Sequence, residues 1–240
     1  MAASSLDAYL NPLLCGNRIA CRRVVQQRLE EIDDPTVLYH ELLWPAMEKV
    51  EKLYRNDRIN AVVESMATRI NRAIADQLQL RLPMRDPNGK RILIAAAPGE
   101  PEELGAQMCA DLFESRGWEV YFVGGPVPND ELMSLCGKLR PDVLMIYGTQ
   151  PHGVPAIREL IEQIRTIGIN PTMNILVSGG VYNRADGLWK EVSADLFAKT
   201  IKDAIPLAES APPRDPEAQR KSGGKKRRRR RRSPLLAAAE

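Results

Sequence analysis

The stretch RILIAAAPGEPEELGAQMCADLFESRGWEVYFVGG, residues 91–125, decides the fold of this chain. It starts with a short apolar run that ends at Pro98-Gly99, continues with apolar residues spaced as on one helical face, stops at Gly117, and resumes with a second apolar run. This order predicts a strand, a glycine-bearing loop, an amphipathic helix and a parallel second strand. Ligands of open α/β sheets bind at the carboxyl ends of strands, so residues 98–105 are the first candidate binding loop, the alternative being an ordinary tight turn.

The composition is typical of a globular protein outside the membrane. Of 240 residues, 44% are hydrophobic and 27% are charged, and no apolar run approaches the ~20 residues of a membrane span. The four cysteines lack the CxxC spacing of metal and redox sites. We therefore expect reduced, mostly buried thiols in a cytoplasmic protein with no membrane partner.

Charge is unevenly distributed along the chain. Residues 209–240 hold 11 Lys and Arg against 4 Asp and Glu, so a strongly basic tail follows a mildly acidic body. The tail is rich in Pro, Ser and Gly, and we expect it to be disordered. Its run of cations is a candidate nucleic-acid site because it matches a phosphate backbone, the alternative being a solvated tail without a role; the run is Lys225, Lys226, Arg227, Arg228, Arg229, Arg230, Arg231 and Arg232.

Upstream of residue 91, apolar residues recur at helical spacing. We expect a helical bundle over residues 5–82, kinked at Pro45, with helices at 6–14, 18–32, 34–54 and 59–80. Strands and helices then alternate through residues 90–208, with further strands at 143–147, 174–177 and 195–197 and further helices at 130–138, 154–167 and 199–207. The predicted fold class is α/β: a four-helix-type bundle followed by a five-stranded parallel, doubly wound sheet of the flavodoxin or Rossmann-like type.

Short motifs recur here in the order and spacing of a known module. They are Gly16-Asn17-Arg18, Leu43-Trp44-Pro45-Ala46-Met47 and Asp57-Arg58-Ile59 in the bundle, and Gly99-Glu100, Glu103-Leu104-Gly105, Gly117-Trp118-Glu119-Val120, Arg140-Pro141-Asp142 and Ser178-Gly179-Gly180-Val181 in the α/β part. Through them, residues 15–208 resemble the cobalamin-binding family, in the form found in light-sensing cobalamin-dependent transcription regulators and corrinoid methyl-transfer proteins. The resemblance implies the fold described above and cobalamin as the cofactor, whereas function depends on the site.

The chain departs from that family at the residues that would meet cobalt. The family's first loop carries a histidine that binds cobalt from below, and Glu102 stands at that position here. A carboxylate suits a cobalt-corrin axial site less well than an imidazole does. The light-sensing regulators also carry a Glu-His pair over the upper cobalt face, where this chain has Glu64-Ser65. We therefore expect no metal ligand, apart from Glu102 if cobalt is ligated by the protein.

Other positions keep the scaffold that the resemblance implies for a cobalamin site. A glycine would let the corrin side approach the first helix, a glycine-rich strand end would offer backbone donors, a hydroxyl residue would lie near the nucleotide tail, and a tryptophan can cover the upper corrin face. Each could instead be an ordinary strand-ending or core residue. The candidates are Gly105, Gly148, Thr149, Ser178, Gly179, Gly180 and Trp44.

The two histidines are weaker candidates. His152 follows the third predicted strand of the sheet and could contact a ligand in the crevice, or lie in an exposed loop without a role. His40 is expected to be a satisfied or surface residue of the bundle. We find no arrangement of side chains that predicts a catalytic residue, and an enzyme is the less favoured interpretation.

Three functional hypotheses remain. The main one is a non-enzymatic sensory or regulatory protein whose scaffold has altered or lost cobalamin binding, because Glu102 and Ser65 replace histidines. The alternatives are a cobalamin carrier for methyl transfer, and a protein-interaction scaffold with a nucleic-acid-binding tail. Each allows a protein partner or a homo-oligomer through the bundle.

Overall fold

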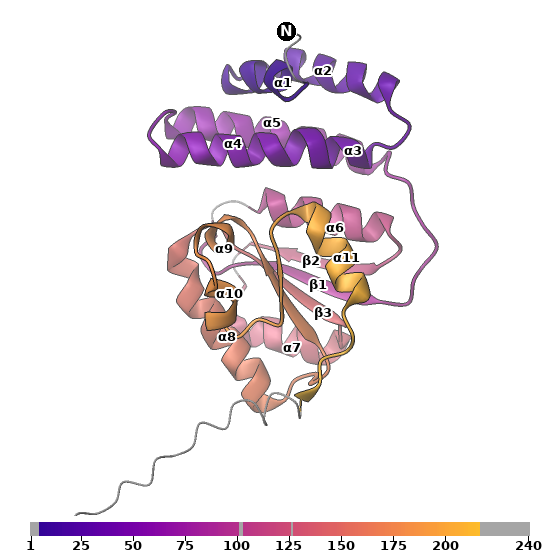
Figure 1. The fold of residues 1–240 in the computed structure, drawn as a ribbon, viewed down its shortest axis with the longest axis vertical. Helices are drawn as coiled ribbons and strands as arrows, with labels where there is room; N and C mark the ends of the chain where they lie inside the picture. Colours follow the sequence, from indigo (N-terminus) through magenta and orange to yellow (C-terminus); the bar gives the residue numbers. More distant parts are fainter. Residues whose placement is uncertain (1–4, 101–102, 126, 217–240) are drawn as a thin grey trace, which may run out of the picture.

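The computed structural model describes residues 5–100, 103–125 and 127–216, and it places two layers of helices over one face of an α/β domain (Figure 1). The outer layer consists of α1 (Ser5–Leu14) and α2 (Arg18–Glu31). The inner layer consists of α3 (Thr36–Leu38), a π-helical turn η1 (Tyr39–Leu43), α4 (Trp44–Arg55) and α5 (Ala61–Gln79). The sheet and its helices follow after an irregular segment at residues 80–90.

Side-chain caps set the starts of two bundle helices. The Asn17 side chain accepts a hydrogen bond from the Ala20 backbone amide at 3.0 Å, as expected for the N-cap of α2. Asn60 caps α5 in the same way through the Val63 amide, so this helix starts after the Ile59 predicted from apolar spacing. Two apolar residues of this helix are exposed, Val62 at 65% and Met66 at 39%, although apolar spacing predicts them on its buried side.

A widened turn lies where the sequence predicts a kink. The Trp44 amide donates to the Tyr39 carbonyl, five residues back, and Pro45 comes directly after it as the second residue of α4. Proline has no amide hydrogen to continue the α-helical ladder, so a turn with one extra residue precedes it. The predicted helix at 34–54 is therefore divided into α3, η1 and α4.

The sheet has five parallel strands in the order β2-β1-β3-β4-β5. The strands are β1 (Arg91–Ala96), β2 (Glu119–Gly124), β3 (Val143–Tyr147), β4 (Asn174–Ser178) and β5 (Leu196–Ala198). Helices α6 (Leu104–Ser115) and α11 (Ile201–Ser210) cover the face toward the bundle, and α7 (Asn129–Leu139) and α8 (Val154–Ile167) cover the other face (Figure 1). The predicted α/β class and doubly wound topology are confirmed.

Short helical pieces between the strands were not anticipated. They are η2 (Pro151–Gly153), α9 (Gly180–Arg184) and α10 (Leu188–Glu191). Segments of three to five residues are too short to show a helical period in the sequence. Because α9 follows β4 directly, it lies at the carboxyl edge of the sheet, where a ligand would bind.

Alternation along the strands divides the core in two. In β3, Val143, Met145 and Tyr147 pack toward α6 and the bundle, whereas Leu144 and Ile146 pack toward α7 and α8. Such continuous burial is typical of central parallel strands. Tyr147, the last residue of β3, thus directs its side chain to the side on which the bundle lies.

A buried polar contact joins the bundle to α6. The Tyr39 hydroxyl lies 3.1 Å from the Ala75 carbonyl oxygen and 3.1 Å from Asp111 Oδ2. Burial raises the pKa of the Asp111 carboxyl to about 7, with the nearby charge of Asp76 acting in the same direction. A carboxyl group whose pKa is raised to near neutrality therefore lies between the two parts of the molecule.

The chain remains packed on the sheet beyond α11. Arg214 donates to Asp195 Oδ1 at 3.2 Å, and the Asn174 side chain donates to the Pro212 carbonyl at 2.9 Å. The predicted boundaries at 82, 90 and 208 stay predictions. Among the described residues, no helix combines the length and the apolarity needed to cross a bilayer.

Candidate functional site

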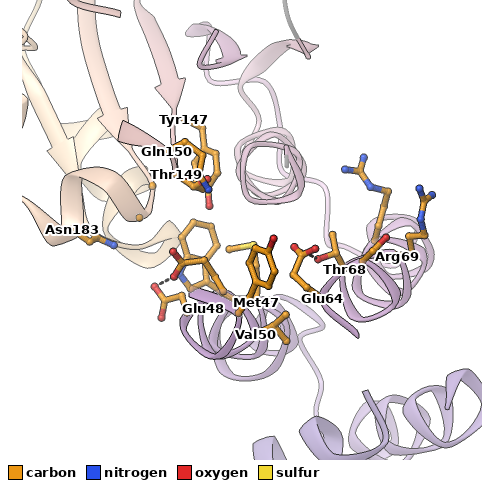
Figure 2. Close-up of a pocket in the computed structure, with 17 residues that line it drawn as sticks. Met47, Glu48, Val50, Glu64, Thr68, Arg69, Tyr147, Thr149, Gln150 and Asn183 are labelled. Atoms are coloured by element: carbon orange, nitrogen blue, oxygen red, sulfur yellow. Dashed lines mark hydrogen bonds between the residues drawn. The ribbon is translucent and has the colours of Figure 1, made fainter. Parts of the chain in front are cut away.

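A cleft of about 630 Å³ lies between the bundle and the carboxyl ends of β3 and β4. In Figure 2, Met47 and Glu48 reach it from α4, Glu64 and Thr68 from α5, and Tyr147, Thr149 and Gln150 from the end of β3. Its volume is in the range of small-molecule and cofactor sites. The bundle and the sheet must both be present to form it.

The inner part of the cleft is aromatic. Trp44, the first residue of α4, is 4% exposed and meets the Tyr147 ring edge-on, with 6.2 Å between centroids and an angle of 81°. Its indole nitrogen donates to Glu48 Oε1 at 2.9 Å, which satisfies the polar atom and fixes the ring. The indole of Trp44 is therefore held in a fixed orientation at the inner end of the cleft.

The rim of the cleft is polar and carries both signs of charge. Carboxylates come from Glu48, Glu51 and Glu64, and guanidinium groups come from Arg69 and Arg72. Thr68 Oγ1 donates to Glu64 at 3.4 Å, and Arg72 reaches α6 by donating to Gln107 Oε1 at 3.2 Å. An apolar interior with convergent polar groups suits a large ring that bears amide arms.

Four of the predicted site residues meet at this cleft. They are Trp44, Thr149, Gly179 and Gly180, and the Glu64-Ser65 pair lines it as well. The histidine position predicted to be occupied by Ser65 thus faces the same space as Trp44. Sequence reasoning placed these residues in four separate segments, and the fold brings them together.

Two other predicted residues lie behind the cleft as supports. Gly179 has φ +107°, and a Cβ there would come within 2.2 Å of the Gly148 carbonyl oxygen, so neighbouring strand ends touch backbone to backbone. The Ser178 hydroxyl is fully buried and donates to the Ala198 carbonyl at 2.9 Å. Gly148 and Ser178 are therefore used in joining strand ends and do not line the cleft.

The loops after β1 and β3 are tied by a buried carboxylate. Glu100 is 8% exposed and accepts hydrogen bonds from both the amide and the hydroxyl of Thr149. His152 Nε2 lies 3.0 Å from the Gly99 carbonyl, away from the cleft lining. His40 is half-buried, its Nδ1 has no hydrogen-bond partner, and burial lowers its pKa, so it is neither satisfied nor fully exposed.

Gly105 contacts a residue that sequence reasoning missed. An ideal Cβ at Gly105 would lie 2.2 Å from both Cζ and Oη of Tyr147, far inside van der Waals contact. The helix thus approaches the aromatic ring, where the sequence predicts an approach to a corrin. One signal for Tyr147 was available: it is an aromatic residue at the last position of a buried strand, directly before Gly148.

Several predicted residues lie outside the described part of the chain. These are Glu102 in the first loop and the basic run Lys225, Lys226, Arg227, Arg228, Arg229, Arg230, Arg231 and Arg232. Within residues 5–100, 103–125 and 127–216, no three His, Cys, Asp or Glu side chains gather as a metal site. The cleft, with aromatic residues at its inner end and polar groups at its rim, fits a corrin ring that bears amide arms.

Comparison with known proteins gives two matches to models of a B12 binding domain, one over residues 90–200 and another over residues 6–79. Dimethylamine corrinoid protein 1 of Methanosarcina acetivorans is 21% identical over 204 residues, which cover 82% of this chain and 94% of the relative. Methionine synthase of Mycobacterium tuberculosis is 22% identical over 153 residues, covering 63% of this chain and 13% of that enzyme. The structure of the Methanosarcina barkeri monomethylamine corrinoid protein superposes with a TM-score of 0.77 at 14% identity, covering 85% of this chain and 96% of that one.

Proposed function

The chain belongs to the family of proteins with B12 binding domains, and on this premise we propose that it is a corrinoid carrier that serves a methyl-transferring partner enzyme. The observation that carries the proposal is the cleft, which is lined by both Trp44 and the strand-end glycines Gly179 and Gly180. Relatives named as corrinoid proteins, similar over 94% of the length of one of them, support it.

The main functional prediction, a sensory or regulatory protein with altered or lost cobalamin binding, is wrong. It rested on the absence of two histidines from their expected positions. Similarity to named corrinoid proteins extends over both the bundle and the sheet, which favours the carrier that stood as the alternative. Holding a corrin does not depend on one axial ligand, because ring contacts and hydrogen bonds contribute to binding as well.

Each part of the cleft has a role in the proposed carrier. Trp44 and Met47 would pack against the ring, while Glu48, Glu64 and Arg69 would hydrogen bond with its amide arms. When bound, a corrinoid supplies a cobalt centre that can take up and give away a methyl group. The protein would hold the ring between the bundle and the strand ends and shield it from water, and the partner enzyme would exchange the methyl group.

A carrier of this kind can serve different methyl donors. Relatives that share the module include corrinoid proteins named for dimethylamine and a methionine synthase. A module found with different partners carries the methyl group and does not choose its source. The similarity to these relatives also supports the proposed protein partner, a methyl-transferring enzyme.

A titration with a matched pair of variants tests the carrier. Full-length protein mixed with hydroxocobalamin should shift the corrin absorption spectrum and retain the corrin on a sizing column at micromolar concentration. Met47→Arg places a long cation in the cleft and should abolish retention, whereas Met84→Arg, at a residue 65% exposed and outside the cleft, should leave it unchanged. Clean separation of corrin from the wild-type protein would refute the proposal.

A further inference from the structure

The side chain of Tyr147 lies between the cleft and the interior of the α/β domain. Its ring is 3% exposed and fills the space between β3 and α6 on the bundle side of the sheet. On one side it contacts Gly105 of α6 so closely that a methyl group would not fit between them. On the other side it meets Trp44 of α4 edge-on.

The strand ends beside Tyr147 are closed as well. The Glu100 carboxylate bridges the loop after β1 to the amide and the hydroxyl of Thr149 in the loop after β3. Gly179 lies against the Gly148 backbone, which closes the gap between the ends of β3 and β4. Together these contacts separate the cleft from the interior of the sheet domain.

This closure determines whether the part of a corrinoid below the ring can enter the α/β domain. Complete cobalamin carries a nucleotide there, made of a planar base, a ribose and a phosphate. The nucleotide can stay folded under the ring with its base on cobalt, or it can be displaced into the protein. Displacement of the nucleotide into this protein would require Tyr147 to leave its site between Gly105 and Trp44. The move would cost free energy, because the packing contacts of the ring would be lost.

We infer that this chain recognises the corrin ring alone, with the nucleotide kept outside the α/β domain, and that Tyr147 is the residue that sets this specificity. The inference rests on the proposed carrier function and deepens it by naming the form of ligand. Tail-free cobinamide then binds as tightly as cobalamin, within about threefold. In bound cobalamin, the cofactor's own base remains the lower ligand of cobalt.

Electron paramagnetic resonance tests where the base lies without relying on any activity. Cob(II)alamin is bound to full-length protein that is uniformly labelled with ¹⁵N. A lower ligand from the unlabelled cofactor splits the cobalt signal into triplets, which is the expected result. Doublets, from a protein nitrogen, or loss of nitrogen splitting, from a displaced base, would overturn the inference while leaving the carrier in place.

Affinities of two variants give a second, independent measurement. Tyr147→Ser opens the passage, so it should raise cobalamin affinity at least about tenfold and change cobinamide affinity by less than about threefold. Tyr147→Phe keeps the ring and should match the wild type with both ligands. Equal effects of Tyr147→Ser on both ligands would contradict the inference. If the wild type binds neither ligand, the proposed carrier function itself is refuted. That outcome differs from equal effects of Tyr147→Ser on both ligands, which would contradict only the inference.

Discussion

Arg184 of α9 donates a 2.8 Å hydrogen bond to Glu51 Oε1 of α4, which links the sheet domain to the bundle beside the cleft. The same guanidinium also donates to the Thr149 carbonyl, at the end of β3. Arg184 therefore holds three elements of the cleft together: α9, α4 and the loop after β3.

Removing this link should loosen the cleft more than it destabilises the fold. Arg184→Ala is expected to raise the rate of corrinoid release several-fold, because the bundle can move away from the strand ends. The side chains are 26% and 32% exposed, so the loss of unfolding free energy should stay within roughly 1 kcal/mol. Stopped-flow release and urea denaturation measure the two quantities. The control is Arg158→Ala, which removes an exposed pair with Glu162 on α8 and should leave release unchanged.

Asp111→Asn should stabilise the protein in a pH-dependent way. Because burial raises the pKa of Asp111 from 3.8 to about 7, the folded state binds a proton that the unfolded state lacks between these values. Stability is full at low pH, falls as pH rises toward 7, and stays reduced above it. The neutral amide avoids this loss, so the variant should exceed the wild type at pH 8 by an amount on the order of a few kcal/mol and match it near pH 4. Urea midpoints across this range measure the difference, and a constant difference at all pH values would contradict the assignment.

The contact between Gly105 and Tyr147 predicts a strong pairwise coupling. Gly105→Ala should cost roughly 1–3 kcal/mol of unfolding free energy, since the new methyl group overlaps the Tyr147 ring. The same change in a Tyr147→Ser background should cost little, and a double-mutant cycle measures the difference. Gly137→Ala in α7 is the matched control: nothing lies within 4 Å of its Cβ position, so it should stabilise by about 0.5–1 kcal/mol.

Trp44→Phe should weaken corrinoid binding without unfolding the bundle. Phenylalanine keeps part of the apolar surface but loses the indole hydrogen bond to Glu48 that fixes the ring. We expect a loss of affinity of about tenfold, measured by absorbance titration. Trp189→Phe, which alters a tryptophan stacked on Phe197 at the other side of the sheet, should leave affinity unchanged.

The basic run at residues 225–232 predicts salt-dependent binding to nucleic acid. Truncation after residue 216 retains the ion pair between Arg214 and Asp195 at 3.2 Å, so it removes the cations and leaves this contact in the sheet domain intact. Affinity for a generic duplex should fall with rising salt in the full chain and be lost in the truncated one. Equal binding by both would mean that the tail has no such role.

The sequence predicted those features that depend on residues close together along the chain. Asn17 before α2, the apolar run at 91–96 and the glycines at 179–180 each define local structure by their own chemistry. The widened turn at Tyr39–Leu43 was not predicted as such, because the sequence indicated only a kink at Pro45. Helices α9 and α10 were not predicted because they are too short to show a helical period in the sequence.

The cleft could be predicted only in part, because its key contact is non-local. Trp44, Gly105 and Tyr147 come from three elements separated by tens of residues. No local sequence pattern indicates that Tyr147 contacts the other two. The motif around Gly105 predicts a close approach to a ligand. In the structure the residue close to Gly105 is Tyr147, because α6 packs against the end of β3.

The π-helical turn at Tyr39–Leu43 has a consequence for the direction of two side chains. One added residue rotates the following helix by about 100° relative to the preceding one. At the start of the turn, Tyr39 points to Ala75 and Asp111; directly after the turn, Trp44 points to Tyr147 and the cleft. In an uninterrupted α-helix the two residues would be out of phase with these partners. The orientation of the indole in the cleft is thus set by a single-residue insertion in the helix that carries it.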